Sequence, residues 1–120
     1  MHELSIAESV VRVASRHAAG RSVSKVTVKM GHLRQVVPSA LEFAFELVAE
    51  GTEVAGADLA LEEVPAAGTC RECGVESELD VFPLQCRRCG GLDMEVTRGE
   101  ELLVDSLELD EEQVLATRGV

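Results

Sequence analysis

Two matched pairs of cysteines place the strongest constraint on how this 120-residue chain can fold. One pair is Cys70 and Cys73, the other is Cys86 and Cys89, and a glycine directly follows each pair. Each Cys-x-x-Cys turn can direct both sulfurs to the same side, and the loop between the pairs is long enough to bring them together. Four thiolates about 2.3 Å from one ion form the tetrahedral site that zinc prefers. We therefore expect a four-cysteine zinc site.

Protein ligands would fill all four coordination positions of this site, so its expected role is structural and not catalytic. An iron electron carrier of the rubredoxin type would use similar paired turns, but such sites are usually shielded by aromatic clusters, and only Phe82 lies nearby. A zinc ribbon that binds nucleic acid or a transcription complex is the alternative function, because Arg71, Arg87 and Arg88 flank the cysteines. The net charge of −11 and the absence of Trp and Tyr argue against nucleic-acid binding.

Hydrophobic periodicity predicts two helices in the first half of the chain. A Ser-x-x-Glu capping box at Ser5 predicts a helix that begins at residue 4 or 5 and ends at Gly20. Residues 1–3 would then lie just outside this helix. Pro38, or Ser39 with Glu42, predicts the start of a second helix, and Gly51 predicts its end.

Three strands are predicted around residues 26–30, 58–62 and 101–109. In the last of these, the apolar residues change from even to odd positions after Val104. This change of phase indicates a bulge near Asp105, or a strand covered on both faces. The acidic residues at 108–112 are expected to form a solvated edge and tail.

The order of the predicted elements indicates an α+β fold. Two helices would lie against a three-stranded sheet, with a four-cysteine zinc-ribbon-like module inserted before the last strand. The domains would be residues 1–66 plus 98–120, and residues 67–97. The inserted segment contains few apolar residues, so bound metal must supply much of its stability. No apolar run reaches about 18 residues and no leader sequence is recognisable, so we expect a cytoplasmic protein with no membrane partner.

Met1, His2 and Glu3 form a second candidate metal site. The Met1 amine and the His2 amide would form a five-membered chelate ring, and the His2 imidazole with that amide a six-membered ring. Glu3 would complete a square plane through its amide or carboxylate, an arrangement that favours Ni(II) or Cu(II) over zinc. A histidine at position 2 is usually only an exposed terminus, so the residues alone leave both interpretations open. His17 is expected to be a charge at a helix end, and His32 a turn residue that could approach a partner.

Further motifs cover nearly the whole length of the chain. They are Met1-His2-Glu3-Leu4-Ser5, Lys29-Met30-Gly31-His32-Leu33, Leu41-Glu42-Phe43-Ala44-Phe45-Glu46, Gly51-Thr52, Gly56-Ala57, Gly99-Glu100-Glu101-Leu102 and Leu107-Glu108-Leu109. Together with the two cysteine pairs, these motifs make the chain resemble the HypA/HybF family of hydrogenase maturation proteins, which are nickel metallochaperones. The resemblance favours the metal-binding interpretation of the N-terminus.

The resemblance implies a carrier of Ni(II) with a structural Zn(II), and not an enzyme. Such carriers work with a HypB-type GTPase and deliver nickel to the precursor of the [NiFe]-hydrogenase large subunit, and some also serve urease. No nucleic-acid partner is implied, and a homodimer is left open. The metal ligands carried over by position are, for nickel, Met1, His2 and Glu3, and, for zinc, Cys70, Cys73, Cys86 and Cys89.

Two positions depart from the family pattern. Relatives often have an acidic residue just before the second helix, a further candidate nickel donor, whereas this chain has Val37 there. The fourth nickel ligand is therefore not identified. The second cysteine pair also lacks the common prolines and reads Gln85-Cys86-Arg87, which is expected to affect local rigidity more than the choice of metal.

Overall fold

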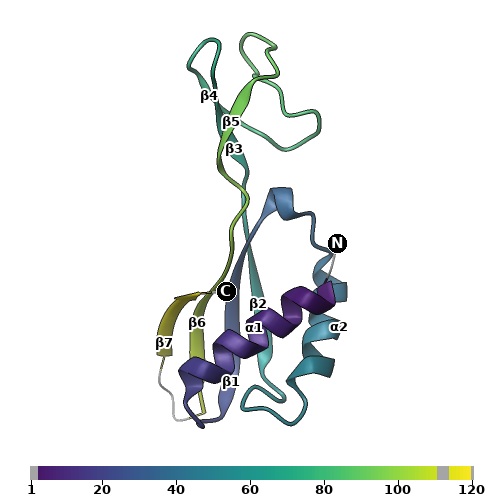
Figure 1. The fold of residues 1–120 in the computed structure, drawn as a ribbon, viewed down its shortest axis with the longest axis vertical. Helices are drawn as coiled ribbons and strands as arrows, with labels where there is room; N and C mark the ends of the chain where they lie inside the picture. Colours follow the sequence, from purple (N-terminus) through teal and green to yellow (C-terminus); the bar gives the residue numbers. More distant parts are fainter. Residues whose placement is uncertain (1–2, 111–113, 120) are drawn as a thin grey trace.

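A larger part of two helices and a sheet is joined end to end with a smaller sheet, and the molecule is elongated (Figure 1). The computed structural model describes residues 3–110 and 114–119, with side chains described over 3–110. Its principal extents are 52 × 25 × 16 Å. No helix in the described parts is long and apolar enough to span a membrane. In chain order the elements are α1 (Glu3–Ala18), β1 (Val23–Gly31), the 3-10 helix η1 (His32–Arg34), α2 (Pro38–Ala49), β2 (Asp58–Val64), β3 (Ala67–Cys70), β4 (Glu76–Glu78), β5 (Met94–Arg98), β6 (Leu102–Leu109) and β7 (Val114–Gly119).

The two predicted helices are present, although the first begins earlier than expected. α1 starts at Glu3, so the predicted start at residue 4 or 5 is wrong, and Glu3 does not lie outside the helix. Ser5 consequently lies inside the first turn and not at the cap. A carboxylate at Glu3 suits the positive end of the helix dipole. α2 begins at Pro38 and ends at Ala49, two residues before Gly51, which has a φ of 77°. This boundary is as predicted.

The core of the larger part is almost entirely aliphatic. It lies where the two helices pack against each other and against the sheet. Its largest fully buried side chains include Phe45, Leu41 and Leu107. The helices contribute Ile6, Ala7, Val10, Val11, Val13, Ala14, Ala18, Leu41, Ala44, Phe45 and Ala49, and the strands contribute Val23, Val26, Val28, Met30, Val104, Leu107 and Leu109.

The larger sheet has four strands in the order β2-β1-β6-β7. β1 and β2 are parallel, and α2 lies in the connection between them, as a parallel pair requires. β6 pairs antiparallel with β1, and β7 pairs antiparallel with β6. The α+β class with its cysteine module is confirmed, but the predicted count of three strands is too low. The fourth strand, β7, was not predicted because it follows the acidic residues 108–112, which are typical of a solvated tail. It pairs with β6.

The change of phase in the last predicted strand is a β-bulge. Thr27 pairs with Ser106 while its neighbour Val28 pairs with Val104, so Asp105 is the extra residue. The bulge allows Val104 and Leu107 both to face the core, although they stand at positions of opposite parity. The predicted position of the bulge is therefore confirmed.

The smaller sheet has three antiparallel strands in the order β4-β3-β5. Two short connections join it to the larger sheet, one between Val64 and Ala67 and the other between Arg98 and Leu102. Figure 1 shows both connections running side by side along the long axis. The cysteine module therefore projects from one end of the larger part.

Gly31 lies where β1 meets the second connection, and we expect Gly31→Ala to destabilise the protein strongly. A Cβ at this position would overlap the carbonyl group of Gly99 and lie 2.6 Å from the backbone nitrogen of Glu100. Backbone atoms cannot easily move to relieve this overlap, because the Gly31 amide donates a hydrogen bond of 2.7 Å to the Glu101 carbonyl. The expected loss is about 3 kcal/mol, at the upper end of overpacking costs. Urea unfolding followed by far-UV circular dichroism measures it.

Gly56→Ala is the control for this experiment. Gly56 has a φ of 76° and open space around its Cα, so an alanine there has only a conformational cost of about 1 kcal/mol. A Gly31→Ala variant no less stable than Gly56→Ala would contradict the close approach at the junction.

Candidate metal centres

The four cysteines of the two pairs converge on one point. Cys70 ends β3, and the sulfur ligand atoms of all four residues lie within 4.8 Å of one another. The Sγ–Sγ distance is 3.6 Å both between Cys70 and Cys89 and between Cys73 and Cys86. A tetrahedron with metal–sulfur bonds of 2.3 Å has edges of about 3.8 Å. None of the four forms a disulfide, so the cluster has the composition and dimensions of a four-cysteine metal site.

The two cysteine turns have the same backbone geometry. The Gly74 amide donates to the Cys70 carbonyl at 2.8 Å, and the Gly90 amide donates to the Cys86 carbonyl at 3.0 Å. Both glycines have positive φ, 80° and 76°. Amides just beyond the turns then point at the sulfurs, and the Gly91 amide lies 3.4 Å from Cys89 Sγ. Such donors stabilise thiolates and so favour a bound cation.

The surroundings shift the pKa values of two of the thiols in opposite directions. Hydrogen bonds from the backbone amides of Cys89 and Arg88 lower the pKa of Cys86 to about 6. For Cys89, the Gly91 amide lowers the pKa, but hydrogen bonds with Cys70 and the other thiols, together with burial, raise it to about 12. The closely spaced sulfurs of the cluster thus share protons, and a bound divalent cation would displace these protons. Metal binding here is therefore expected to weaken in acid.

Two of the three arginines beside the cysteines are paired with carboxylates of the same module. Arg71 lies 2.7 Å from Asp93 and 3.9 Å from Glu95, and Arg87 lies 2.8 Å from Asp80. These arginines therefore have intramolecular partners in place of phosphates. This pairing weakens the alternative of a nucleic-acid-binding zinc ribbon.

The structure provides only part of the N-terminal candidate site. Met1 and His2 lie outside the described residues. The Glu3 carboxylate accepts a hydrogen bond of 3.4 Å from the Val37 amide, at the start of α2. Glu3 therefore places a carboxylate beside the position where relatives often have an acidic residue and this chain has Val37. The first turns of both helices meet at this point.

The two remaining histidines have different environments. His17 lies in the last turn of α1, as predicted, with Nδ1 2.9 Å from the Val13 carbonyl oxygen. His32 begins η1 and contacts both Glu63 and Asp80. These partners are 31 and 48 residues away in the chain, so no local sequence pattern could have indicated them.

The fold and the cysteine cluster define an α+β protein with a metal-binding module at one end. Residues 1–109 match the family model described as "Hydrogenase/urease nickel incorporation, metallochaperone, hypA", and the chain belongs to this HypA family. A relative named hydrogenase maturation factor HypA from Geotalea uraniireducens is 44% identical, over 92% of this chain and 100% of the relative. The protein of the same name from Nostoc punctiforme is 36% identical, over 92% and 97%.

Solved structures agree with this assignment. The solution structure titled as the Ni metallochaperone HypA from Helicobacter pylori aligns with a TM-score of 0.62 and 25% identity, over 91% of this chain and 97% of that chain. Another, titled as the solution structure of HypA protein, has a TM-score of 0.65 over 91% and 96%. At 24% identity, the second comparison supports the fold alone.

Proposed function

We propose that this chain is a nickel metallochaperone for [NiFe]-hydrogenase maturation and is not an enzyme. It binds Ni(II) as cargo through Met1, His2 and Glu3, while Cys70, Cys73, Cys86 and Cys89 hold structural Zn(II). The observation that carries the proposal is the match of residues 1–109 to the nickel-incorporation family, since that match includes the N-terminal triplet. The convergence of the four sulfurs supports the zinc assignment.

The N-terminal donors suit a site that must both bind and release its metal. An amine, a deprotonated amide and an imidazole form a square-planar nitrogen set that favours Ni(II) over zinc. The Glu3 carboxylate lies at the adjoining start of α2 and supplies negative charge next to this set. A chain terminus makes few contacts, so a partner can take the metal without opening the core.

Residues 1–66 plus 98–120 form the nickel-binding domain, and residues 67–97 form the zinc-binding domain. Nickel passes with the help of a HypB-type GTPase to the hydrogenase large-subunit precursor in the cytoplasm. Urease is a further client class, since the family description includes urease. A homodimer is compatible with these roles.

Blocking the terminal amine tests the nickel site directly. Addition of Gly-Ser before Met1 moves the free amine away from His2, so the five-membered chelate ring is lost. After exposure to nickel and desalting, we expect about one nickel and one zinc per chain in the parent protein, but only zinc in the extended protein. Addition of Gly-Ser after Val120 is the matched control and should leave both metals bound. Equal nickel content in the two extended proteins would refute the N-terminal site.

A further inference from the structure

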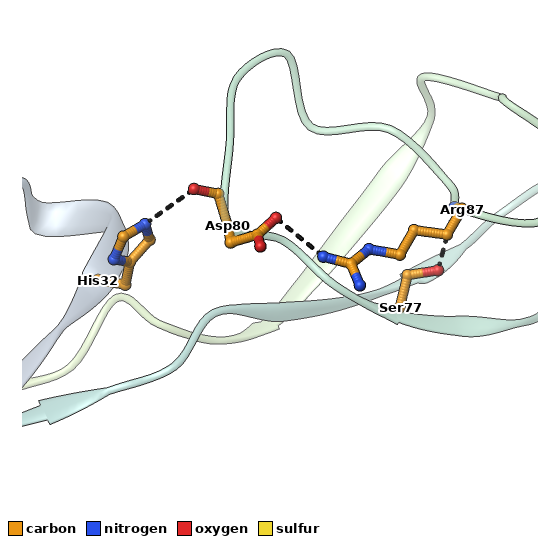
Figure 2. Close-up of polar contacts among 4 residues, drawn as sticks. All are labelled: His32, Ser77, Asp80 and Arg87. Atoms are coloured by element: carbon orange, nitrogen blue, oxygen red, sulfur yellow. Dashed lines mark hydrogen bonds and ion pairs between the residues drawn. The ribbon is translucent and has the colours of Figure 1, made fainter.

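One imidazole ring bridges the two parts of the molecule. His32 Nδ1 lies 2.9 Å from Glu63 Oε1 on β2, in the larger sheet. His32 Nε2 lies 3.2 Å from the carbonyl oxygen of Asp80, in the loop that follows β4 of the cysteine module. Figure 2 shows the His32 ring facing the carbonyl oxygen of Asp80. The contact is therefore a non-covalent link between the two parts, in addition to the two chain connections that join the sheets.

The bridge continues into the second cysteine turn. The Asp80 carboxylate pairs with Arg87 Nη2 at 2.8 Å, and the Arg87 amide donates to Ser77 Oγ at 3.3 Å (Figure 2). Ser77 is buried on β4, and Arg87 directly follows the ligand Cys86. A movement of the loop at Asp80 would therefore displace Arg87 and, with it, the turn that contains Cys86 and Cys89.

Both atoms that face the ring are hydrogen-bond acceptors. A neutral imidazole has one N–H and one lone pair, so it can donate to Glu63 or to Asp80 but not to both. Only the imidazolium, with two N–H groups, satisfies both partners. The contact across the two parts is complete only in the protonated form.

The charges around His32 favour that form. The Glu63 carboxylate and the Asp80 carbonyl oxygen face the ring, and the nearby Asp80 carboxylate pairs with Arg87. Arg34 on η1 donates to the Glu100 carbonyl. The hydrogen bond with Glu63, followed by that with the Asp80 backbone, raises the pKa of His32 above its ordinary value. An open cavity of about 260 Å³, lined in part by Phe82, adjoins the ring, so water can exchange protons with it.

We propose that His32 is a pH-sensitive latch that fixes the orientation of the cysteine module relative to the larger part. With the imidazolium the latch is closed on Glu63 and Asp80. The sign follows from the raised pKa: the restraint is fully present below the ordinary pKa of histidine and is lost as pH rises through that of the folded protein. The latch is independent of nickel and so goes beyond the proposed function.

The experiment is an NMR titration of zinc-loaded protein between about pH 5.5 and 8.5, with zinc content checked at each point. Imidazole shifts report the protonation of His32, and amide shifts report the loop from Asp80 to Arg87. Residual dipolar couplings report the relative orientation of the two sheets. We expect the loop shifts to follow the His32 titration, and the two sheets to lose their common alignment above its midpoint.

Three variants make the result decisive. His32→Gln should abolish the pH dependence of the loop and keep the alignment seen at high pH throughout. Glu63→Gln should move the loop transition to lower pH, because it removes the charge that favours the imidazolium. His17→Gln, at the far end of α1, is the matched control and should behave as the parent. Loop shifts that do not titrate in the parent, or that still titrate in His32→Gln, would overturn the latch. If His32→Gln does not fold, the parent and Glu63→Gln titrations decide alone.

Discussion

Replacement of His2 with alanine is expected to lower the affinity for Ni(II) by more than about 100-fold while leaving the zinc content unchanged. Loss of the imidazole removes one donor and opens the six-membered chelate ring. Changes to groups that only support a ligand already cost about 10- to 100-fold in affinity, so loss of a ligand should cost more. The remaining amine and amide donors would also lose their preference for square-planar nickel.

Calorimetry on zinc-loaded protein with a native N-terminus measures this effect. Mass spectrometry should first show that Met1 is retained, since the proposed site includes its amine. His17→Ala is the matched control, because His17 lies in the last turn of α1 and Glu3 in the first. Parent-like affinity in His2→Ala, or an equal loss in His17→Ala, would be evidence against the terminal site.

Removal of zinc is expected to unfold residues 67–97 while α1 and β1 remain folded. The cysteine module has little core of its own: besides Cys70 and Cys86, its buried side chains include only small residues and Leu79. Three of its larger apolar side chains are exposed: Val81, Phe82 and Leu92, the last two at 57% and 65%. Structural zinc contributes about 10–16 kcal/mol in comparable small modules, which no other interaction here replaces.

Hydrogen exchange with and without a chelator tests this expectation. Amide protection across 67–97 should fall by at least about 100-fold, while the protection of β1 changes little. Cys86→Ser should reproduce the effect without a chelator. Arg88→Ala is the matched control, because it alters the same turn but removes no ligand. Undiminished protection of the module after chelation would show that its fold does not depend on metal.

Much of the fold could be predicted because it depends on short-range patterns. The periodicity of 3.6 residues located both helices, and the alternation along β1 and β6 identified the strands and the bulge at Asp105. The errors fall where the pattern is weak or non-local. α1 starts at Glu3 although Ser5 carries the capping signal, and β7 is a strand because the edge of β6 is available to it.

The two candidate metal sites differ in what supports them. Four cysteines at this spacing can coordinate one ion tetrahedrally, and their sulfurs converge as expected. The proposed nickel site has no comparable local signal, because a histidine at position 2 is common at exposed termini. The family match supports it, and the placement of the Glu3 carboxylate at the start of α2 is consistent with it.

By itself the sequence determined which residues could bind metal, where two helices lie, and where the phase of the last strand changes. These features depend on residues a few positions apart, whose geometry the backbone imposes. Only the tertiary structure decided that Glu3 meets Val37 and that His32 joins Glu63 to Asp80. Those contacts link residues separated by 31 to 48 positions, and chain folding, not local propensity, brings them within hydrogen-bond distance.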